Sequence, residues 1–209
     1  DFVANVSHEV RTPLTVLSGF VETMASLPLG DEDRARMLVL MQQQTHRMQV
    51  LVADLLTLSQ LEGSPGPGAG LPVDLDALVR RAVDDARGLS KGRHEFVLPG
   101  DLHVQLDGAE PELQSGLGNL LSNAVRYTPD GGRIEVSWRA LGDGSGVLGV
   151  TDNGPGIARE HLPRLTERFY RVDGSRSRAT GGTGLGLSIV KHVMQRHGGE
   201  LLIDSEPGK

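Results

Sequence analysis

Cysteine is absent from this 209-residue sequence, and so are long hydrophobic runs. The lack of cysteine excludes a disulfide framework and a thiolate metal site, and it fits a reducing compartment such as the cytoplasm. No run approaches the roughly 18 apolar residues that a membrane helix needs. The sequence begins without methionine and already inside a helical pattern, so we expect upstream segments to carry any sensor or membrane anchor.

Basic residues are outnumbered by acidic ones. The chain has 21 Lys and Arg against 27 Asp and Glu, a formal net charge of -6. Nucleic acid or an anionic membrane surface would favour a basic face, so neither is expected as a direct partner. Hydrophobic residues make up 38% of the chain, which is enough for a globular core, and the length allows one large domain or two modest ones.

The N-terminal region has the hydrophobic periodicity of two helices. Apolar residues recur every three or four positions, first up to about Leu27 and then from Asp31 to Leu61, and Pro28 and Gly30 interrupt the pattern. The apolar positions are Val6, Val10, Leu14, Leu17, Val21 and Met24, then Leu38, Met41, Met48, Val52, Leu55 and Leu58. We predict an antiparallel helical hairpin that forms a homodimeric four-helix bundle, because two helices alone bury their apolar stripes poorly.

A change in composition separates this hairpin from the rest of the chain. The stretch GSPGPGAG, residues 63–70, contains only small residues and proline, so it cannot continue a helix. Beyond it, the patterns indicate helices near 75–89, 111–126 and 185–197, and strands near 94–98, 103–106, 133–140, 147–151 and 200–203. We predict domains at 1–62 and 72–209 joined by a flexible linker at 63–71, the second domain being an α+β sandwich.

His8 lies between the apolar positions of the first helix, so it is predicted to face solvent. Glu9 is adjacent, and Thr12 follows one turn later. Pro13 cannot donate a hydrogen bond to the carbonyl of Glu9, so we expect the helix to bend or loosen here. A neutral imidazole is a competent nucleophile near neutral pH, and a neighbouring carboxylate can orient it. Without further context, however, an exposed histidine is more often an ordinary surface residue.

The stretch SHEVRTPLT, residues 7–15, resembles the phosphoacceptor box of histidine kinases over its whole length. The resemblance implies that His8 is the phosphorylated residue and that Glu9 is its base or orienting group. It also implies that Thr12, alone or with Glu9, positions water when the enzyme dephosphorylates its partner. The other histidines show no ligand spacing and receive no role: His46, His94, His103, His161, His192 and His197.

The second half of the chain contains two short motifs that suit a nucleotide. NLLSNAVRYT places Asn119 and Asn123 on one helical face, where amide oxygens are suitable ligands for Mg²⁺. Arg126 and Tyr127 follow, a cation for a polyphosphate and a ring that can pack on a base. DNGPG places Asp152 before a glycine turn, where its carboxylate can accept the amino group of adenine.

A third motif, GGTGLGLSIVK, is a glycine-rich loop at residues 181–191 that runs into an apolar helix. Backbone amides near residues 184–187 can hold phosphate at the N-terminus of that helix. Neither GxxxxGK[ST] nor GxGxxG fits, which excludes a P-loop and weakens a dinucleotide reading. The preceding stretch ERFYRVDGSRSRATGG is rich in Arg, Ser and Gly, which suits a mobile lid over a charged ligand.

The order of these motifs resembles the ATP-binding domain, with the Bergerat or GHKL fold, that histidine kinases share with gyrase-type topoisomerases, a class of chaperones and MutL repair proteins. The resemblance covers nearly all of residues 72–209 and implies ATP as substrate, with Mg²⁺ held by Asn123 and Asn119. Arg126 stands where lysine is frequent in the kinases, which keeps the charge but alters the donor geometry. The implied nucleotide contacts are Arg126, Tyr127, Asp152, Gly154, Gly156, Ile157, Phe169, Gly182, Thr183, Gly184, Leu185, Gly186 and Leu187.

Together the two resemblances imply the core of a sensor histidine kinase, with a dimeric helical hairpin followed by an α+β sandwich. Such a core autophosphorylates His8, transfers the phosphoryl group to an aspartate of a response regulator receiver domain, and dephosphorylates that regulator. Within the family, the combination of ANVSHEVRTPLTVLSGF, ERFYRVDGSRSR and TGGTGLGLSIVKHVMQRHGG is most similar to the sensor kinases of the bacterial phosphate regulon. We therefore expect a cytoplasmic domain of an inner-membrane protein.

Two other functions remain as alternatives at this point. A dimeric scaffold would bind ATP as a conformational switch without phosphorylating itself. An ATPase or chaperone of the wider fold family would release phosphate without a covalent intermediate. The SHEVRTPLT stretch argues against both, because neither function needs an exposed histidine with Glu and Thr beside a proline in a helix.

Overall fold

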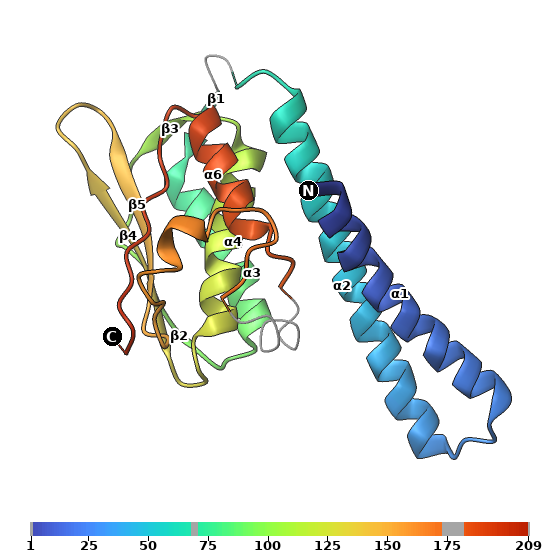
Figure 1. Cartoon of the computed structure of the whole chain (residues 1–209). Coiled ribbons are helices and arrows are strands. Elements are labelled where there is room, and N and C mark those ends of the chain that lie inside the picture. The colour runs from blue at the N-terminus through green and yellow to red at the C-terminus, as the bar shows by residue number, and fades with distance from the viewer. Residues whose placement is uncertain (1, 68–70, 173–181, 209) are drawn as a thin grey trace.

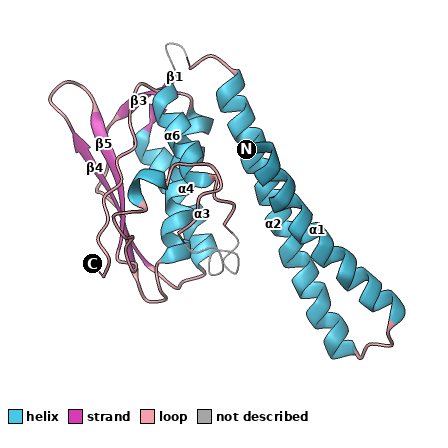
Figure 2. Ribbon diagram, viewed as in Figure 1, coloured by secondary structure: helices cyan, strands magenta, loops and turns pink. Residues whose placement is uncertain are grey.

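The computed structural model describes residues 2–67, 71–172 and 182–208 and consists of a long helical hairpin beside a body of helices and strands (Figure 1). The expected fold class, a helical region followed by a region of helices on a mixed sheet, is confirmed. In the body, the sheet that contains β4 and β5 lies on the side away from the hairpin, with helices between the two (Figure 2).

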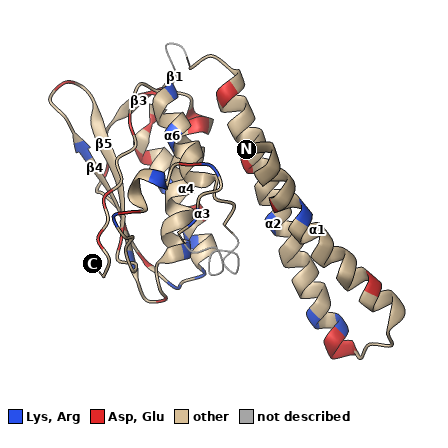
Figure 3. Ribbon diagram, viewed as in Figure 1, with Lys and Arg blue, Asp and Glu red and all other residues tan. Residues whose placement is uncertain are grey.

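The hairpin consists of α1 (Phe2–Ser26) and α2 (Asp31–Gly63). The backbone of Gly30 is extended before the first turn of α2, which contains Asp31, Glu32 and Asp33. Carboxylates there interact favourably with the positive end of the helix dipole, and Figure 3 shows them at the far end of the hairpin. Much of the apolar surface of the hairpin faces solvent in the single chain, including Val3, Leu14, Val16, Val21, Leu38, Val39, Leu40, Val52 and Leu56.

The body contains three helices and two small sheets among its described residues. Its helices are α3 (Leu75–Ser90), α4 (Glu110–Tyr127) and α6 (Gly186–Arg196). One sheet has the order β2 (Glu95–Val97), β4 (Arg133–Ala140), β5 (Gly146–Asp152), with β2 parallel and β5 antiparallel to β4. The second pairs β1 (Leu71–Asp74) antiparallel with β3 (Gln105–Gly108). A short 3-10 turn, η1, spans Leu162–Arg164.

The main core lies between the three-stranded sheet and the helices α3 and α4. Ile134 and Val136 of β4 are buried there against Leu78, Val83 and Leu121. Burying a side chain of this size contributes about 1.5–3 kcal/mol relative to leaving it exposed. Asp74 precedes α3 and accepts a hydrogen bond from the N–H of Ala77 at 3.1 Å, which caps the first turn.

The strand pattern differs from expectation at two places. β1 was not predicted, because a stretch of four residues containing Pro72 becomes a strand only through its pairing with β3. The strand expected at residues 200–203 is wrong, since residues 199–206 form no strand. Leu202 is 72% exposed, so the apolar pair Leu201 and Leu202 does not mark a buried strand.

The hairpin packs on the body through α2 and α6. Leu51, Leu58 and Leu61 of α2 join Leu185, Ile189 and Val193 in a second apolar cluster. Arg196, at the end of α6, donates to the carbonyl oxygens of Leu61 at 2.9 Å, Ser64 at 2.6 Å and Pro65 at 3.0 Å. It also pairs with Glu112 of α4 at 2.7 Å, so one arginine joins the end of α2, the start of the linker and two helices of the body.

Within residues 2–67, 71–172 and 182–208, no helix is both long enough and apolar enough to cross a membrane.

Candidate functional site

His8 is exposed on α1, as its position in the helical pattern predicted. The hydroxyl of Thr12 donates to the carbonyl oxygen of His8 at 3.1 Å. Pro13 is buried, and α1 continues across it to Ser26. The Thr12 hydroxyl therefore bonds the carbonyl next to that of Glu9, which is the helical acceptor that Pro13 cannot serve.

Glu9 points into the contact between the hairpin and the body. Its Oε2 lies 3.0 Å from a guanidinium nitrogen of Arg47 on α2 and 3.3 Å from one of Arg171 in the body. The side chains of Glu9, Arg47 and Arg171 are 20%, 14% and 10% exposed. Burial lowers the pKa of Arg171, and the charge of Glu9 opposes that shift. The residue beside His8 is thus held by cations from two separate elements.

A pocket of about 310 Å³ brings His8 next to the segment that follows η1. The guanidinium carbon of Arg164 lies 4.2 Å from the centre of the Tyr170 ring. That of Arg168 lies 4.9 Å from the centre of the Phe2 ring. The pocket is lined by Asn5, His8, Glu9, Arg164, Glu167, Arg168, Phe169 and Tyr170. His8 therefore shares one pocket with Arg164 and Arg168.

Tyr127 lies between two of the predicted nucleotide motifs. Its carbonyl oxygen is 3.3 Å from the position that a Cβ on Gly154 would take, and its hydroxyl is 3.7 Å from the corresponding position on Gly182. A nitrogen of Arg126 is 3.2 Å from the same position on Gly182. The end of α4, the DNGPG turn and the glycine-rich loop therefore meet, although they are far apart in the sequence.

Asp152 ends β5 and shapes the turn that follows. Its Oδ1 accepts a hydrogen bond from the N–H of Gly154 at 2.9 Å, and the side chain is exposed. The N–H of Ile157 donates to the hydroxyl of Ser205 at 2.9 Å. Gly156 has φ +72° and lies against the carbonyl of Glu206, a position where an L side chain would be strained. Among the residues that the structure describes, none is seen to hydrogen-bond the second carboxylate oxygen of Asp152.

The amide oxygen of Asn119 faces the start of α6. Its amide nitrogen donates to the carbonyl oxygen of Ser115 at 3.0 Å, while its Oδ1 lies 2.7 Å from the position a Cβ on Gly186 would take. Asn123 is half-buried one turn later on α4. Amide oxygens are hard ligands that suit Mg²⁺ when phosphate oxygens and water complete its shell. Asn119 and Asn123 therefore fit the metal implied by the sequence.

The backbone of Phe169 forms a hydrogen bond with the glycine-rich loop. Gly184 has φ +76°, and its carbonyl oxygen accepts from the N–H of Phe169 at 2.8 Å. Phe169 itself has φ +65°, which is uncommon for a bulky residue and marks local strain. Leu185 is buried, and α6 begins at Gly186, with Leu187 half-buried on its first turn. Residues 173–181, most of the expected lid, lie outside the described residues.

Asp54 was not identified from the sequence, although it lies in the site. It accepts a hydrogen bond from the hydroxyl of Thr183 at 2.6 Å, across the contact between α2 and the glycine-rich loop. Burial raises its pKa, while the bond from Thr183 and the charge of Arg126 partly oppose that shift. A signal was present in the sequence, because Asp54 occupies a helical stripe otherwise formed by Leu51, Leu55 and Leu58.

Two of the remaining histidines are structural. His94 is buried between the hydroxyl of Ser90 and the carbonyl of Thr128, at 3.0 Å from each. His197 receives a hydrogen bond from the N–H of Ala109 on its Nε2 at 3.0 Å. Within the described ranges, no group of three or more His, Cys, Asp or Glu side chains is arranged to hold a metal ion.

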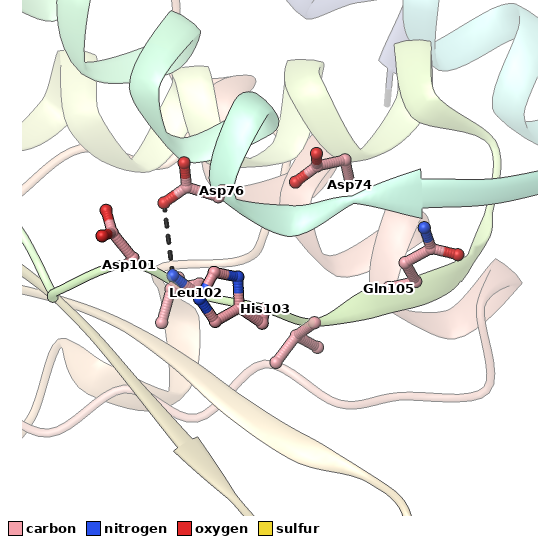
Figure 4. Close-up of a pocket in the computed structure, with 7 residues that line it drawn as sticks. Asp74, Asp76, Asp101, Leu102, His103 and Gln105 are labelled. Atoms are coloured by element: carbon pink, nitrogen blue, oxygen red, sulfur yellow. Dashed lines mark hydrogen bonds between the residues drawn. The ribbon is translucent and has the colours of Figure 1, made fainter.

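A larger pocket of about 450 Å³ lies elsewhere, at the start of α3 (Figure 4). There the N–H of Leu102 donates to Asp76 at 3.3 Å. A hydrogen bond from Arg80 lowers the pKa of Asp76, the largest of several effects on it. The pocket contains none of the residues predicted from the sequence motifs, and its acidic side chains stabilise the chain locally.

Comparison with protein families gives two matches. The model of the His Kinase A (phospho-acceptor) domain matches residues 1–64. The model described as histidine kinase-, DNA gyrase B- and HSP90-like ATPase matches residues 108–209. The two matched ranges contain His8 and the three nucleotide motifs, respectively.

Three similar proteins extend these matches. The chain is 54% identical to the phosphate regulon sensor protein PhoR of Pseudomonas aeruginosa over all of its own length and 47% of that protein. The solved structure of the mycobacterial sensor histidine kinase MprB is 32% identical, with TM-score 0.53, and the match covers 62% of this chain and 80% of that one. The histidine kinase ThkA, solved in complex with the response regulator TrrA, has TM-score 0.73 at 20% identity and covers 95% of this chain and 55% of its own. The chain thus spans about half the length of the curated relative that it matches.

Proposed function

Because the chain belongs to the family of sensor histidine kinases, we propose that it transfers the γ-phosphate of ATP to His8. From there the phosphoryl group passes to an aspartate of a response regulator. The observation that carries the proposal is the convergence of the end of α4, the DNGPG turn and the glycine-rich loop around Tyr127 and Gly182.

The ATPase part of this family uses ATP. Different residues of the converging motifs bind the adenine base and the phosphates. Asp152 accepts the adenine amino group with the oxygen not used by Gly154, and Tyr127 and Ile157 pack on the base. Arg126 and the backbone amides of residues 182–187 bind the phosphates. Asn123 and Asn119 would hold Mg²⁺, which would supply positive charge to neutralise the phosphates.

His8 attacks the γ-phosphorus with a ring nitrogen, so that an N–P bond forms while the bond to the ADP oxygen breaks. Glu9 takes the proton from the other ring nitrogen or holds it as positive charge develops. Glu9 pairs instead with Arg47 and Arg171 in this structure. The arrangement described here therefore precedes or follows the transfer, and the reaction requires the body to move relative to the hairpin.

The partners follow from the same site. A receiver domain with an acceptor aspartate reaches His8 from solvent, and Thr12 positions water for dephosphorylation of that partner. A relative has been solved in complex with its response regulator, which supports this class of partner. The exposed apolar residues of α1 and α2 support a homodimer in which a second hairpin covers them.

We place the hairpin at residues 1–62, the linker at 63–71 and the ATP-binding domain at 72–209. The identity to a phosphate regulon sensor protein supports a role in phosphate signalling. A longer protein in this role would be anchored in the inner membrane by other segments, with this part in the cytoplasm.

The test is incubation with Mg²⁺ and γ-labelled ATP, followed by treatment of the labelled protein with acid and base. We expect label that is stable in base and labile in acid, and its loss in His8→Ala with ATP binding retained. His46→Ala is the matched control, because His46 is also exposed on the hairpin and should not affect labelling. Label that persists in His8→Ala contradicts the assignment, and ATP binding without label favours the scaffold function.

A further inference from the structure

Asp54 is a carboxylate in a contact that is otherwise apolar. It lies on α2 between Leu51 and Leu58, which are 3% and 1% exposed where they pack on α6. Its burial raises its pKa, which means that the ionised form costs free energy in this position. A leucine would fit the same stripe without that cost, so stability does not explain an acid here.

The partners of Asp54 belong to the nucleotide site. The hydroxyl of Thr183 donates to Asp54 at 2.6 Å, and the N–H of Leu185 reaches the same hydroxyl at 3.3 Å. Arg126 attracts the carboxylate electrostatically. A hydroxyl, the backbone of a glycine-rich loop and an arginine are groups that commonly bind phosphate. Asp54 therefore places a negative charge at a position suited to a phosphate oxygen.

Glu9 repeats this arrangement from the other helix of the hairpin. It pairs with Arg171 at 3.3 Å, and Arg171 also donates to the carbonyl oxygen of Gly182. Two carboxylates of the hairpin thus face two arginines and a threonine of the body around one loop. The hairpin supplies negative charge and the body supplies positive charge and a hydroxyl donor, as a bound anion and its site would.

We propose that Asp54 acts as a surrogate for a nucleotide phosphate, so that docking of the hairpin on the body and binding of ATP phosphates exclude each other at Thr183. The proposal rests on the proposed function, which places the phosphates at this loop. Its consequence is that Asp54 lowers the affinity for phosphorylated nucleotides but not for the nucleoside. A nucleotide must release Thr183 from Asp54, and it thereby weakens the docked arrangement, as reciprocal coupling requires.

The test is equilibrium binding of adenosine, ADP and ATP, with Mg²⁺, to the unmodified chain and to Asp54→Ala. We expect Asp54→Ala to bind ADP and ATP about 5-fold more tightly or better, which is the lower end of typical coupling between sites. Adenosine affinity, measured by competition against a fluorescent ADP analogue, should stay the same. An equal gain for adenosine would mean that the substitution opens the whole site, and it would overturn the proposal.

The matched control is Glu62→Gln. Glu62 is also an acid of α2 that contacts the body, where it pairs with Arg168 and lies 3.1 Å from His192. Neither of these pairs involves Thr183 or Gly182. Glu62→Gln should therefore raise the affinity for ADP clearly less than Asp54→Ala does. Equal gains in the two variants would assign the effect to undocking in general and contradict the role of Asp54.

Failure of the proposed function gives a different result. If the unmodified chain and Asp54→Ala both fail to bind ADP, the nucleotide site itself is wrong. If both bind ADP with the same affinity, the nucleotide site stands and only the role of Asp54 is overturned.

Discussion

Asp54 shows how a single buried carboxylate links stability to pH. Its pKa in the folded chain is raised above the ordinary 3.8, chiefly by burial. Between the ordinary pKa of 3.8, which applies to the unfolded chain, and the raised pKa of the folded chain, the folded state binds more protons than the unfolded state. The free energy of unfolding therefore falls as pH rises through this range. The ionised carboxylate therefore destabilises the folded chain at neutral pH, and an uncharged side chain of the same shape avoids that loss.

We expect Asp54→Asn to have a higher free energy of unfolding than the unmodified chain at neutral pH. The difference should shrink as pH falls towards 3.8, where Asp54 becomes protonated in the folded state. Urea unfolding of both proteins over this range measures the difference. A difference that is independent of pH would contradict the expectation.

Asp143 provides a control of opposite sign. Hydrogen bonds from Ser145 lower its pKa, so its contribution to stability is present at neutral pH and is lost as pH falls through the lowered value. Asp143→Asn should therefore be less stable than the unmodified chain at neutral pH, with a difference that also narrows in acid.

At the scale of elements, the glycine-rich loop depends on its backbone conformation more than on its side chains. Gly184 has φ +76°, and a Cβ there would lie 2.8 Å from the Cα of Phe169. The contact is with backbone, so it cannot be relieved by rotating a side chain. The loop can therefore enter α6 at this angle only with glycine at this position.

We expect Gly184→Ala to destabilise the chain by about 1–3 kcal/mol, the usual cost of a residue forced into a disfavoured backbone region. Gly118→Ala is the control, because Gly118 lies inside α4 with nothing within 4 Å of the added Cβ. That substitution should stabilise the chain by about 0.5–1 kcal/mol. Urea unfolding of both variants distinguishes the two effects, and equal stability of Gly184→Ala and the unmodified chain would argue against the strain.

At the scale of the whole molecule, Arg196 holds the hairpin and the body in one arrangement. It donates to three carbonyl oxygens at the end of α2 and the start of the linker, and it pairs with Glu112. The side chain of Arg196 is 11% exposed, and its bonds to Leu61 and Glu112 are partly buried, whereas those to Ser64 and Pro65 are exposed. Without them, the apolar contact between α2 and α6 and the polar contacts of Glu9, Asp54 and Glu62 with the body oppose separation.

We expect Arg196→Met to increase the radius of gyration measured by small-angle X-ray scattering, because the hairpin separates from the body more often. Arg80→Met is the control, since Arg80 pairs with Asp76 and Asp101 within the body and is 52% exposed. It should leave the radius of gyration unchanged. The same radius for Arg196→Met and the unmodified chain would show that the other contacts between the hairpin and the body hold the arrangement without Arg196.

The sequence by itself determined the helices and the positions of the motifs. The two long helices follow from apolar residues at helical spacing and from the break at Pro28 and Gly30, which are local signals. The exposure of His8 follows from the same spacing. The three nucleotide motifs could be identified because glycine, asparagine and aspartate have specific local roles that do not depend on distant partners.

Only the tertiary structure decided how these parts meet. The bond between Thr183 and Asp54 joins residues 129 apart, and that between Arg171 and Glu9 joins residues 162 apart. The strand β1 exists because β3 pairs with it, and residues 200–203 are not a strand despite their composition. Such contacts depend on which surfaces pack together, and a periodic pattern shows only that a face is apolar, not what covers it.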